Sequence, residues 1–231
     1  MHISYSQHGP RYNIMKELVL VRHGEAEHLV KGIIGGWSNL PLTDRGRQQI
    51  GITANRLKEL FDSRIEIMYT SDLRRASESA EIINEKFDVP LVIDSRFREN
   101  SAGIAEGMTV VEAEKIAIPV SEPIGDWIPY PEAESWRMLQ DRVASVLSQL
   151  EQKQEEVLLI VAHGNTNSAI IEWWLQLPEA PVLSFTTHLA SITWLGMNAF
   201  GHREMRKLNE SAHLMNEGLD DCIPERYTLF I

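Results

Sequence analysis

The sequence predicts an α/β protein, built as a three-layer α/β/α sandwich around a mostly parallel central sheet. Two short apolar runs support this fold, residues 18–21 (LVLV) and 157–161 (VLLIV), because unbroken branched apolar residues are typical of strands buried on both faces of a parallel sheet. Strand-like and helix-like segments alternate along the rest of the chain. Each run ends beside a histidine that precedes a glycine, His23 and His163, and ligands of open α/β sheets bind at this end of the strands.

The first half of the chain contains three predicted strands and two helices. After the first strand, three glycines between residues 32 and 36 mark a loop. Thr43 is the expected N-cap of a helix that runs towards Phe61. The predicted elements that follow are a strand at 65–69, a helix opened by Ser71 and Asp72, and a strand at 90–93.

The second half begins with a long irregular segment. Residues from about 104 to 134 contain several prolines, so we expect an excursion over the sheet that acts as a lid. Within it, Trp127 and Tyr130 are expected to pack the lid rather than to contact a substrate. The predicted elements that follow are a helix capped by Ser135, the strand at 157–161, a helix at 165–177 and a strand at 190–195.

The size and composition of the chain indicate one domain. With 231 residues, of which 43% are hydrophobic, the chain can bury one large core. We expect a single domain over residues 15–231, preceded by an extension of residues 1–14. This extension lacks the apolar stretch of a signal peptide.

The charge and the apolar patterning limit the classes of partner. A formal net charge of -11 disfavours a nucleic-acid partner, since phosphate backbones are bound by clustered Lys and Arg. No apolar run approaches the roughly 18 residues of a membrane span, and the single Cys222 cannot form an intrachain disulfide. These features predict a cytoplasmic protein with no nucleic-acid or membrane partner. Trp173 and Trp174 share one predicted helix; we favour core packing for at least one, while an exposed apolar face there would indicate a homodimer.

Polar side chains follow four of the predicted strands and can face one pocket. Arginine guanidinium groups bind phosphate oxygens two at a time, so clustered arginines and histidines suit a phosphoryl group. The same positive charges repel a metal ion, and no third ligand with zinc-site spacing accompanies the histidines. The residues at these strand ends are Arg22 and His23; Ser71, Arg74 and Arg75; Arg98 and Glu99; and His163.

This set of side chains can carry out phosphoryl transfer. A histidine beside arginines holds its proton weakly, so its imidazole nitrogen is free to attack phosphorus. The leaving alkoxide needs a proton, and Glu99 is the carboxyl group best placed to donate it. Arg74 is expected to be a solvated surface charge.

The run LVLVRHGEAE resembles the signature of the histidine phosphatase superfamily, which has the phosphoglycerate mutase-like fold. Further segments are similar to later motifs of the family, in the same order along the chain. These segments are residues 36–48, 69–80, 98–107, 161–164 and 208–214, so the resemblance spans about residues 17–214.

The resemblance implies a role for each candidate residue. By motif position, His23 becomes a phosphohistidine, Arg22, Arg75 and His163 hold the phosphoryl oxygens, and Glu99 is the proton donor. It implies neither a metal nor an organic cofactor.

The chain departs from the family pattern near the first histidine. Ala26 and Leu29 occupy positions where members often carry side-chain hydrogen-bond donors. Backbone N–H groups, including that of Gly164, together with Asn165 or Thr166, are the expected replacements for binding the substrate. Four other histidines lack a partner pattern and are expected to be structural or surface residues: His28, His188, His202 and His213.

The acidic residues of the predicted lid favour a phosphatase over a mutase. Between residues 106 and 134 there are seven acidic residues and one base, Lys115, and such a segment repels a highly anionic bisphosphate. We therefore predict a metal-independent phosphatase that acts on a small phosphate monoester. Two alternatives stay open: a cofactor-dependent phosphoglycerate mutase, and a phospho-ligand binding module with little turnover.

Overall fold

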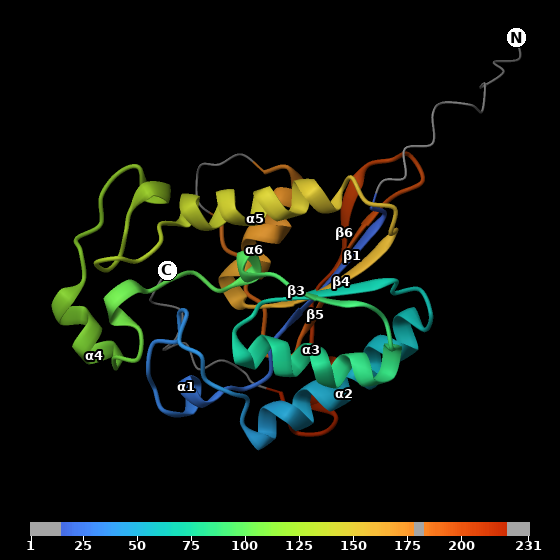
Figure 1. Ribbon diagram of the computed structural model, residues 1–231, viewed down its shortest axis with the longest axis horizontal. Helices are drawn as coiled ribbons and strands as arrows, with labels where there is room; N and C mark the ends of the chain where they lie inside the picture. The colour runs from blue at the N-terminus through green and yellow to red at the C-terminus, as the bar shows by residue number, and fades with distance from the viewer. Residues whose placement is uncertain (1–14, 178–182, 221–231) are drawn as a thin grey trace, which may run out of the picture.

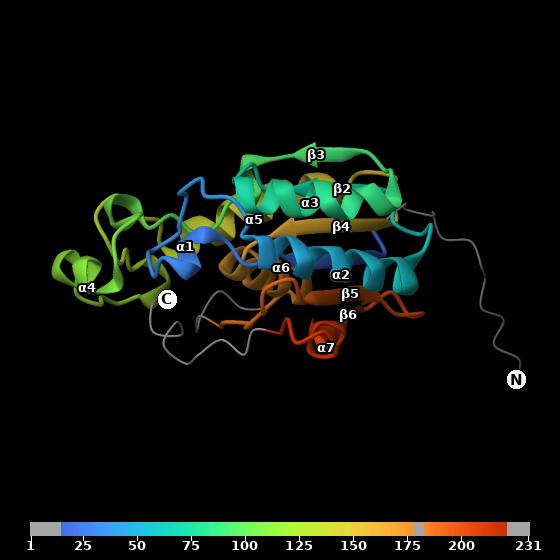
Figure 2. The same cartoon turned by 90° about the horizontal axis from the view of Figure 1, so that it is seen from below.

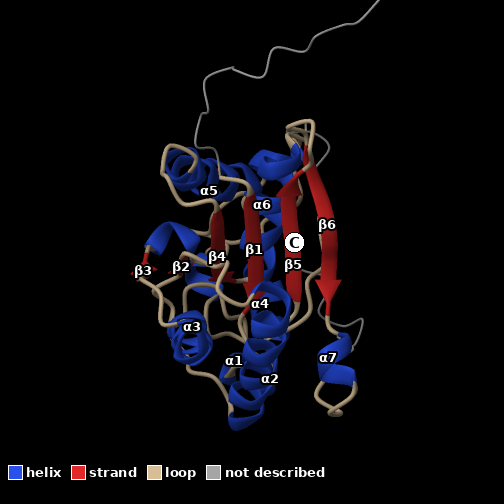
Figure 3. Cartoon of the chain, turned by 90° about the vertical axis from the view of Figure 1, so that its right-hand side faces the viewer, coloured by secondary structure: helices blue, strands red, loops and turns tan. Residues whose placement is uncertain are grey.

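The computed structural model describes residues 15–177 and 183–220 (Figure 1). Its centre is a six-stranded sheet with the order β3-β2-β4-β1-β5-β6 (Figure 3). The pairs β1/β4, β4/β2 and β2/β3 are parallel, whereas β5 and β6 pair antiparallel, which confirms the mostly parallel sheet. The strands are β1 (Glu17–Arg22), β2 (Ile67–Thr70), β3 (Leu91–Ile93), β4 (Val157–Ala162), β5 (Ile192–Met197) and β6 (Arg203–Glu210).

Helices cover both faces of the sheet and complete the predicted three layers (Figure 1). The residues of β1 alternate between two apolar cores: Leu18 and Leu20 belong to the core beneath α5 and α6, and Val19 and Val21 to the core beneath α2 and α3. All four are fully buried, so an unbroken apolar run is required here. The helices are α1 (Glu27–Val30), α2 (Asp44–Phe61), α3 (Arg74–Phe87), α4 (Val110–Ala113), α5 (Trp136–Leu150), α6 (Gly164–Leu175) and α7 (Ala212–Met215).

Two of the predicted helix starts are confirmed and one is displaced. The side chains of Thr43 and Ser135 accept the capping hydrogen bonds of α2 and α5 from backbone N–H groups. The helix expected to open at Ser71 begins instead at residue 74. The Ser71 hydroxyl accepts the N–H of Leu73, and the Asp72 carboxylate is bound by both donors of the Arg98 guanidinium, so both side chains hold the turn before α3.

The antiparallel edge of the sheet differs from the sequence prediction. The strand expected at 190–195 begins at residue 192 because Ala190 adopts a left-handed backbone conformation, with a φ of 55°. β6 was not predicted, since its residues are only partly buried and lack a clear alternation of apolar and polar side chains. Trp174 is 1% exposed and packs in the core, with Trp173 partly buried beside it.

The excursion between β3 and α5 forms a separate small cluster beyond one end of the sheet (Figures 1 and 2). Ala105, Ala113 and Tyr130 are buried within it, and the Trp127 indole donates to the Ile118 carbonyl. Trp127 and Tyr130 therefore pack the excursion itself, as expected. Besides α4, the chain between β3 and α5 contains 3-10 helices at Ser95–Phe97, Gly103–Ala105, Glu114–Ile116 and Ile124–Asp126.

Within residues 15–177 and 183–220, no helix has the length and apolar character needed to cross a bilayer. Residues 1–14 and Cys222 lie outside the described residues.

Candidate active site

The two His-Gly strand ends meet because β1 and β4 are adjacent and parallel. Arg22 pairs in register with Ala162, so the next residue of each strand, His23 and His163, emerges at the same edge of the sheet. Their ring centroids lie 5.1 Å apart in an edge-to-face arrangement. Both side chains are buried, at 2% and 0% exposure. The structure thus brings together the two histidines that the sequence singles out.

The tautomer of His23 follows from one hydrogen bond. Its Nδ1 lies 2.7 Å from the carbonyl oxygen of Gly24, and since a carbonyl can only accept, Nδ1 carries the hydrogen. In a neutral ring the lone pair is then on Nε2, which accepts a hydrogen bond from Nε of Arg75 at 3.3 Å. Nε2 is therefore the atom available for nucleophilic attack.

The surroundings of His23 favour its neutral form. Burial lowers the pKa of His23 well below its ordinary value of 6.5, and the positive charges of Arg75 and Arg22 lower it further. The hydrogen bond to Gly24 acts in the opposite direction but is a smaller effect. The imidazole is thus held unprotonated at neutral pH, as a nucleophile must be.

Arg75, the second residue of α3, places a buried positive charge against His23. Its two terminal nitrogens donate to the carbonyl oxygens of Ser38 and Gly36, at 2.9 and 2.8 Å. Burial lowers its pKa to about 10, so the guanidinium stays charged at neutral pH. Arg74, in contrast, pairs with Glu78 on the surface, as expected.

Arg22 brings the second positive charge to the site. Its Nη1 donates to the carbonyl oxygen of Thr187 at 2.6 Å. Gly164, at the start of α6, lies against the same guanidinium, since a Cβ added there would be 3.4 Å from Cζ of Arg22. The N-terminus of α6 and the arginine thus converge beside the two histidines.

His163 shows where a ligand would bind. Among the residues that the structure describes, neither of its ring nitrogens has a hydrogen-bond partner, although both are buried. Burial, followed by the charge of Arg75, lowers the pKa of His163 well below its ordinary value. A buried polar atom without a partner costs about 1–3 kcal/mol, and an anionic ligand between the arginines and histidines would supply the missing partner.

Glu99 is held beside the N-terminus of α6 through both its backbone and its side chain. Its carboxylate accepts the N–H of Asn100 at 2.8 Å and the N–H of Asn165 at 3.3 Å. Its carbonyl oxygen accepts from the Trp37 indole at 2.7 Å and from Arg142 at 3.2 Å. The backbone N–H of Asn165, a residue expected to bind the substrate, is therefore bonded to the candidate proton donor.

Arg142 on α5 fixes the whole segment before Glu99, a role that the sequence did not indicate. Its Nη1 donates to the carbonyl oxygens of Arg96 and Arg98, at 2.8 and 3.0 Å. Its charge is paired with Glu134 at 2.7 Å. Arg142 and its partner lie outside every strand end, so no local pattern marks them. Thr166, considered as a phosphate donor, instead donates its hydroxyl to the Arg98 carbonyl.

A third imidazole, that of His28, is buried near the site, which fits the structural alternative of the sequence expectation. His28 is 7% exposed, and its ring centroid lies 6.0 Å from that of His23. His213 is structural, as expected, since it bonds Thr53 and Glu210. A four-residue helix such as α1 has too little periodicity to show which of its side chains points inward.

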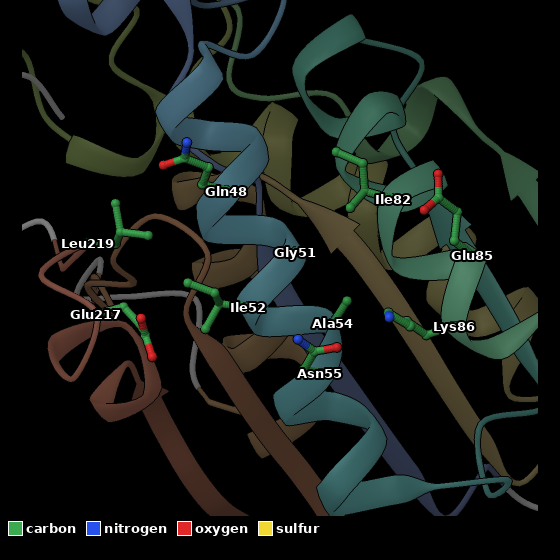
Figure 4. Close-up of a pocket in the computed structure, with 10 residues that line it drawn as sticks. All are labelled: Gln48, Gly51, Ile52, Ala54, Asn55, Ile82, Glu85, Lys86, Glu217 and Leu219. Carbon is green, nitrogen blue, oxygen red and sulfur yellow. The ribbon is translucent and has the colours of Figure 1, made fainter.

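One groove in the described part of the chain lies apart from this site. A groove of about 640 Å³ runs between α2 and α3 and contains none of the candidate residues (Figure 4). In the described part of the chain, no group of three or more His, Cys, Asp or Glu side chains is placed to hold a metal ion. The groove is lined by Gln48, Gly51, Ile52, Ala54, Asn55, Ile82, Glu85, Lys86, Glu217 and Leu219.

Comparison with known sequences relates this site to one family. The profile of the histidine phosphatase superfamily (branch 1) matches residues 18–211. The chain is 35% identical over 158 residues to a Bacillus subtilis protein named an uncharacterized phosphatase, PhoE, covering 68% of this chain and 76% of that one. It is 31% identical over 217 residues to the mitochondrial serine/threonine-protein phosphatase Pgam5 of Drosophila grimshawi, covering 90% and 68%. It is also 34% identical over 170 residues to an Escherichia coli protein named a probable phosphoglycerate mutase, GpmB, covering 71% and 77%.

Comparison with solved structures supports the same family relationship. A mycobacterial glucosyl-3-phosphoglycerate phosphatase in complex with VO3 superposes with a TM-score of 0.72 at 26% identity, covering 85% of this chain and 100% of that one. YhfR of Bacillus stearothermophilus superposes with a TM-score of 0.70 at 27% identity, covering 86% and 98%.

Proposed function

The chain belongs to branch 1 of the histidine phosphatase superfamily, and we propose that it is a phosphatase that hydrolyses a small phosphate monoester through a phosphohistidine on His23. The observation that carries this proposal is the neutral His23, whose Nε2 lone pair lies against the buried charge of Arg75. The phosphatase names of several relatives support the same reaction class.

In the first step, Nε2 of His23 attacks phosphorus, and the bond from phosphorus to the ester oxygen breaks. Glu99 in its acid form transfers its proton to the departing alkoxide, which leaves as an alcohol. Arg22, Arg75 and His163 stabilise the charge that spreads over the phosphoryl oxygens during transfer.

In the second step, a water molecule attacks the phosphohistidine. The Glu99 carboxylate takes a proton from this water, the P–N bond breaks, and inorganic phosphate is released. The proton taken from water replaces the one that Glu99 gave to the leaving group, and His23 is again neutral. Two arginines already supply the positive charge that a metal ion would bring, so we propose a reaction that requires neither a metal nor an organic cofactor.

Replacement of His23 tests this proposal. His23→Ala removes the nucleophile, and we expect kcat on p-nitrophenyl phosphate to fall at least about 1000-fold, with the wild-type rate unchanged by a chelator. The exposed His202→Ala is the matched control and should keep full activity. Activity of His23→Ala within a few-fold of wild type would contradict the phosphohistidine mechanism.

A phosphoglycerate mutase is the second candidate, favoured by the similarity to the Escherichia coli protein named a probable mutase. The acidic excursion argues against it, since Glu112, Glu114 and Glu122 would repel a bisphosphate primer. Formation of 2-phosphoglycerate from the 3-isomer, dependent on the bisphosphate, would decide for the mutase. Calorimetric binding of a phosphate ester without hydrolysis over hours would instead support a binding module.

We further propose a small phosphorylated substrate and no nucleic-acid partner, since a net charge of -11 disfavours binding to a phosphate backbone. We also propose a cytoplasmic location without a membrane partner, because no apolar run of the sequence approaches the length of a membrane span. A homodimer stays a prediction that light scattering can test.

A further inference from the structure

His28 lies on α1 between the two positions where this chain lacks the family's side-chain donors. Ala26 forms a backbone bridge with Leu42 just before the helix. Glu27 pairs with Lys31 at 2.6 Å, and both side chains of this pair are exposed. His28 is the one residue of α1 that is buried. The helix thus directs a single polar side chain inward.

The His28 ring packs closely against the backbone of Gly35. A Cβ added to Gly35 would lie 2.6 Å from Cδ2 and 2.8 Å from Nε2 of His28, closer than real contacts allow. The imidazole therefore fits only because residue 35 has no side chain. In this position the ring centroid lies 6.0 Å from that of His23, and the residue is 7% exposed.

The Nδ1 atom of His28 needs a partner. It is buried and has no hydrogen-bond partner among residues 15–177 and 183–220. The same holds for both ring nitrogens of His163, so two imidazoles around His23 have unused hydrogen-bonding atoms. Such atoms destabilise a folded protein unless an ordered water molecule or a ligand satisfies them.

The charge of His28 is suited to an anion site that already contains two arginines. Burial, then the charges of Arg75 and Arg22, lowers the pKa of His28 to about 3. The ring is therefore neutral at neutral pH and carries one N–H. It offers a hydrogen-bond donor without a further positive charge that would repel the arginines.

We propose that His28 is a phosphate-binding residue whose Nδ1–H donates to an oxygen of the substrate's phosphoryl group, in place of the side-chain donors that Ala26 and Leu29 do not provide. This role rests on the proposed function, because the phosphoryl group must lie beside His23. It also gives the buried Nδ1 the partner that it lacks.

Orthovanadate binding measures this role without turnover. His28→Phe keeps a ring but no donor, and calorimetry should show orthovanadate bound about 10- to 100-fold more weakly than by wild type, as expected for one lost hydrogen bond to a charged group. His28→Asn places an amide N–H near the position of Nδ1 and should restore affinity to within about threefold. His202→Phe, at an exposed histidine, is the control and should bind as wild type does.

A second measurement uses the unaltered protein and does not depend on the variants folding. With ¹⁵N-labelled histidine, addition of orthovanadate should shift the Nδ1 resonance of His28 as its N–H gains an acceptor. Two outcomes would overturn the role of His28 alone. In the first, His28→Phe binds orthovanadate with the same affinity as wild type. In the second, the Nδ1 resonance of His28 does not move while those of His163 do. No orthovanadate binding and no phosphohistidine in wild type would contradict the proposed function itself.

Discussion

Single atoms decide the chemistry of this site. The carbonyl of Gly24 places the hydrogen of His23 on Nδ1 and so assigns nucleophilic attack to Nε2. Glu99 is fixed by hydrogen bonds from Trp37 and Arg142 to its backbone, which leave its carboxyl group beside the N-terminus of α6. The nucleophile and the proton donor are thus positioned by groups that take no part in bond making.

Replacing Glu99 should separate substrates by their leaving groups. Glu99→Gln cannot protonate a leaving alkoxide, so we expect the single-turnover release of an alkyl alcohol to slow about 100-fold or more. Release of p-nitrophenol should slow less than about tenfold, because this leaving group needs little protonation. Glu85→Gln, an exposed residue on α3, serves as the control. Equal losses on both substrates would argue against Glu99 as the acid.

The helices hold these residues through close backbone contacts, above all where α2 meets the loop after His23. A Cβ on Gly24 would lie 2.4 Å from the carbonyl oxygen of Gly46, and one on Gly46 would lie 2.0 Å from that of Glu25. Neither neighbour can yield, since both are backbone atoms. The N-terminus of α2 therefore touches the catalytic loop only because glycines face each other.

Two alanine substitutions on α2 should have opposite effects. Gly46→Ala forces the helix away from residues 24–25, so we expect a loss of about 2–4 kcal/mol of unfolding free energy together with most of the activity. Gly51→Ala on the same helix meets nothing within 4 Å and should stabilise the protein by up to about 1 kcal/mol through helix propensity. Urea denaturation compares the two. Equal stability of both variants would show that the close contact is unimportant.

The predictability of each element depends on how local its cause is. The sequence predicts β1 and β4 because strands buried on both faces require an unbroken apolar run. It predicts the starts of α2 and α5 because the capping side chains of Thr43 and Ser135 are local signals. β6, an edge strand with partly buried residues, carries no such pattern.

The site residues also differ in how directly the sequence predicts them. His23 and His163 follow strand ends, where the sequence points to them. His28 and Arg142 reach the site through tertiary packing of α1 and α5, which local patterns do not encode.

The molecule as a whole buries three imidazoles in one place, and this couples its stability to pH. The pKa of His23, His28 and His163 is lowered in the folded protein, first by burial. In the unfolded chain these groups take up protons as the pH falls below about 6.5, while the folded protein does not. Their contribution to stability is therefore complete above about pH 6.5 and is lost as the pH falls, down to about pH 3 for His28.

The expected slope can be measured by urea denaturation between about pH 7 and pH 5. Each histidine contributes up to about 1.4 kcal/mol per pH unit, so the three together give a loss of up to about 4 kcal/mol per unit below pH 6.5. Glu172, whose pKa is raised by burial, acts in the opposite direction. His28→Asn should reduce the slope by about 1 kcal/mol per pH unit, and an unchanged slope would contradict this account.

The strand order has a further consequence during synthesis of the chain. β1 is made first, but its two partners in the sheet are β4 and β5, which lie in the last third of the sequence. Pairing of such distant segments is slow, because a long loop must close before any contact is gained. A nascent chain therefore exposes the apolar run of β1 until β4 and β5 have left the ribosome, and it brings His23 and His163 together only after β4 has been made.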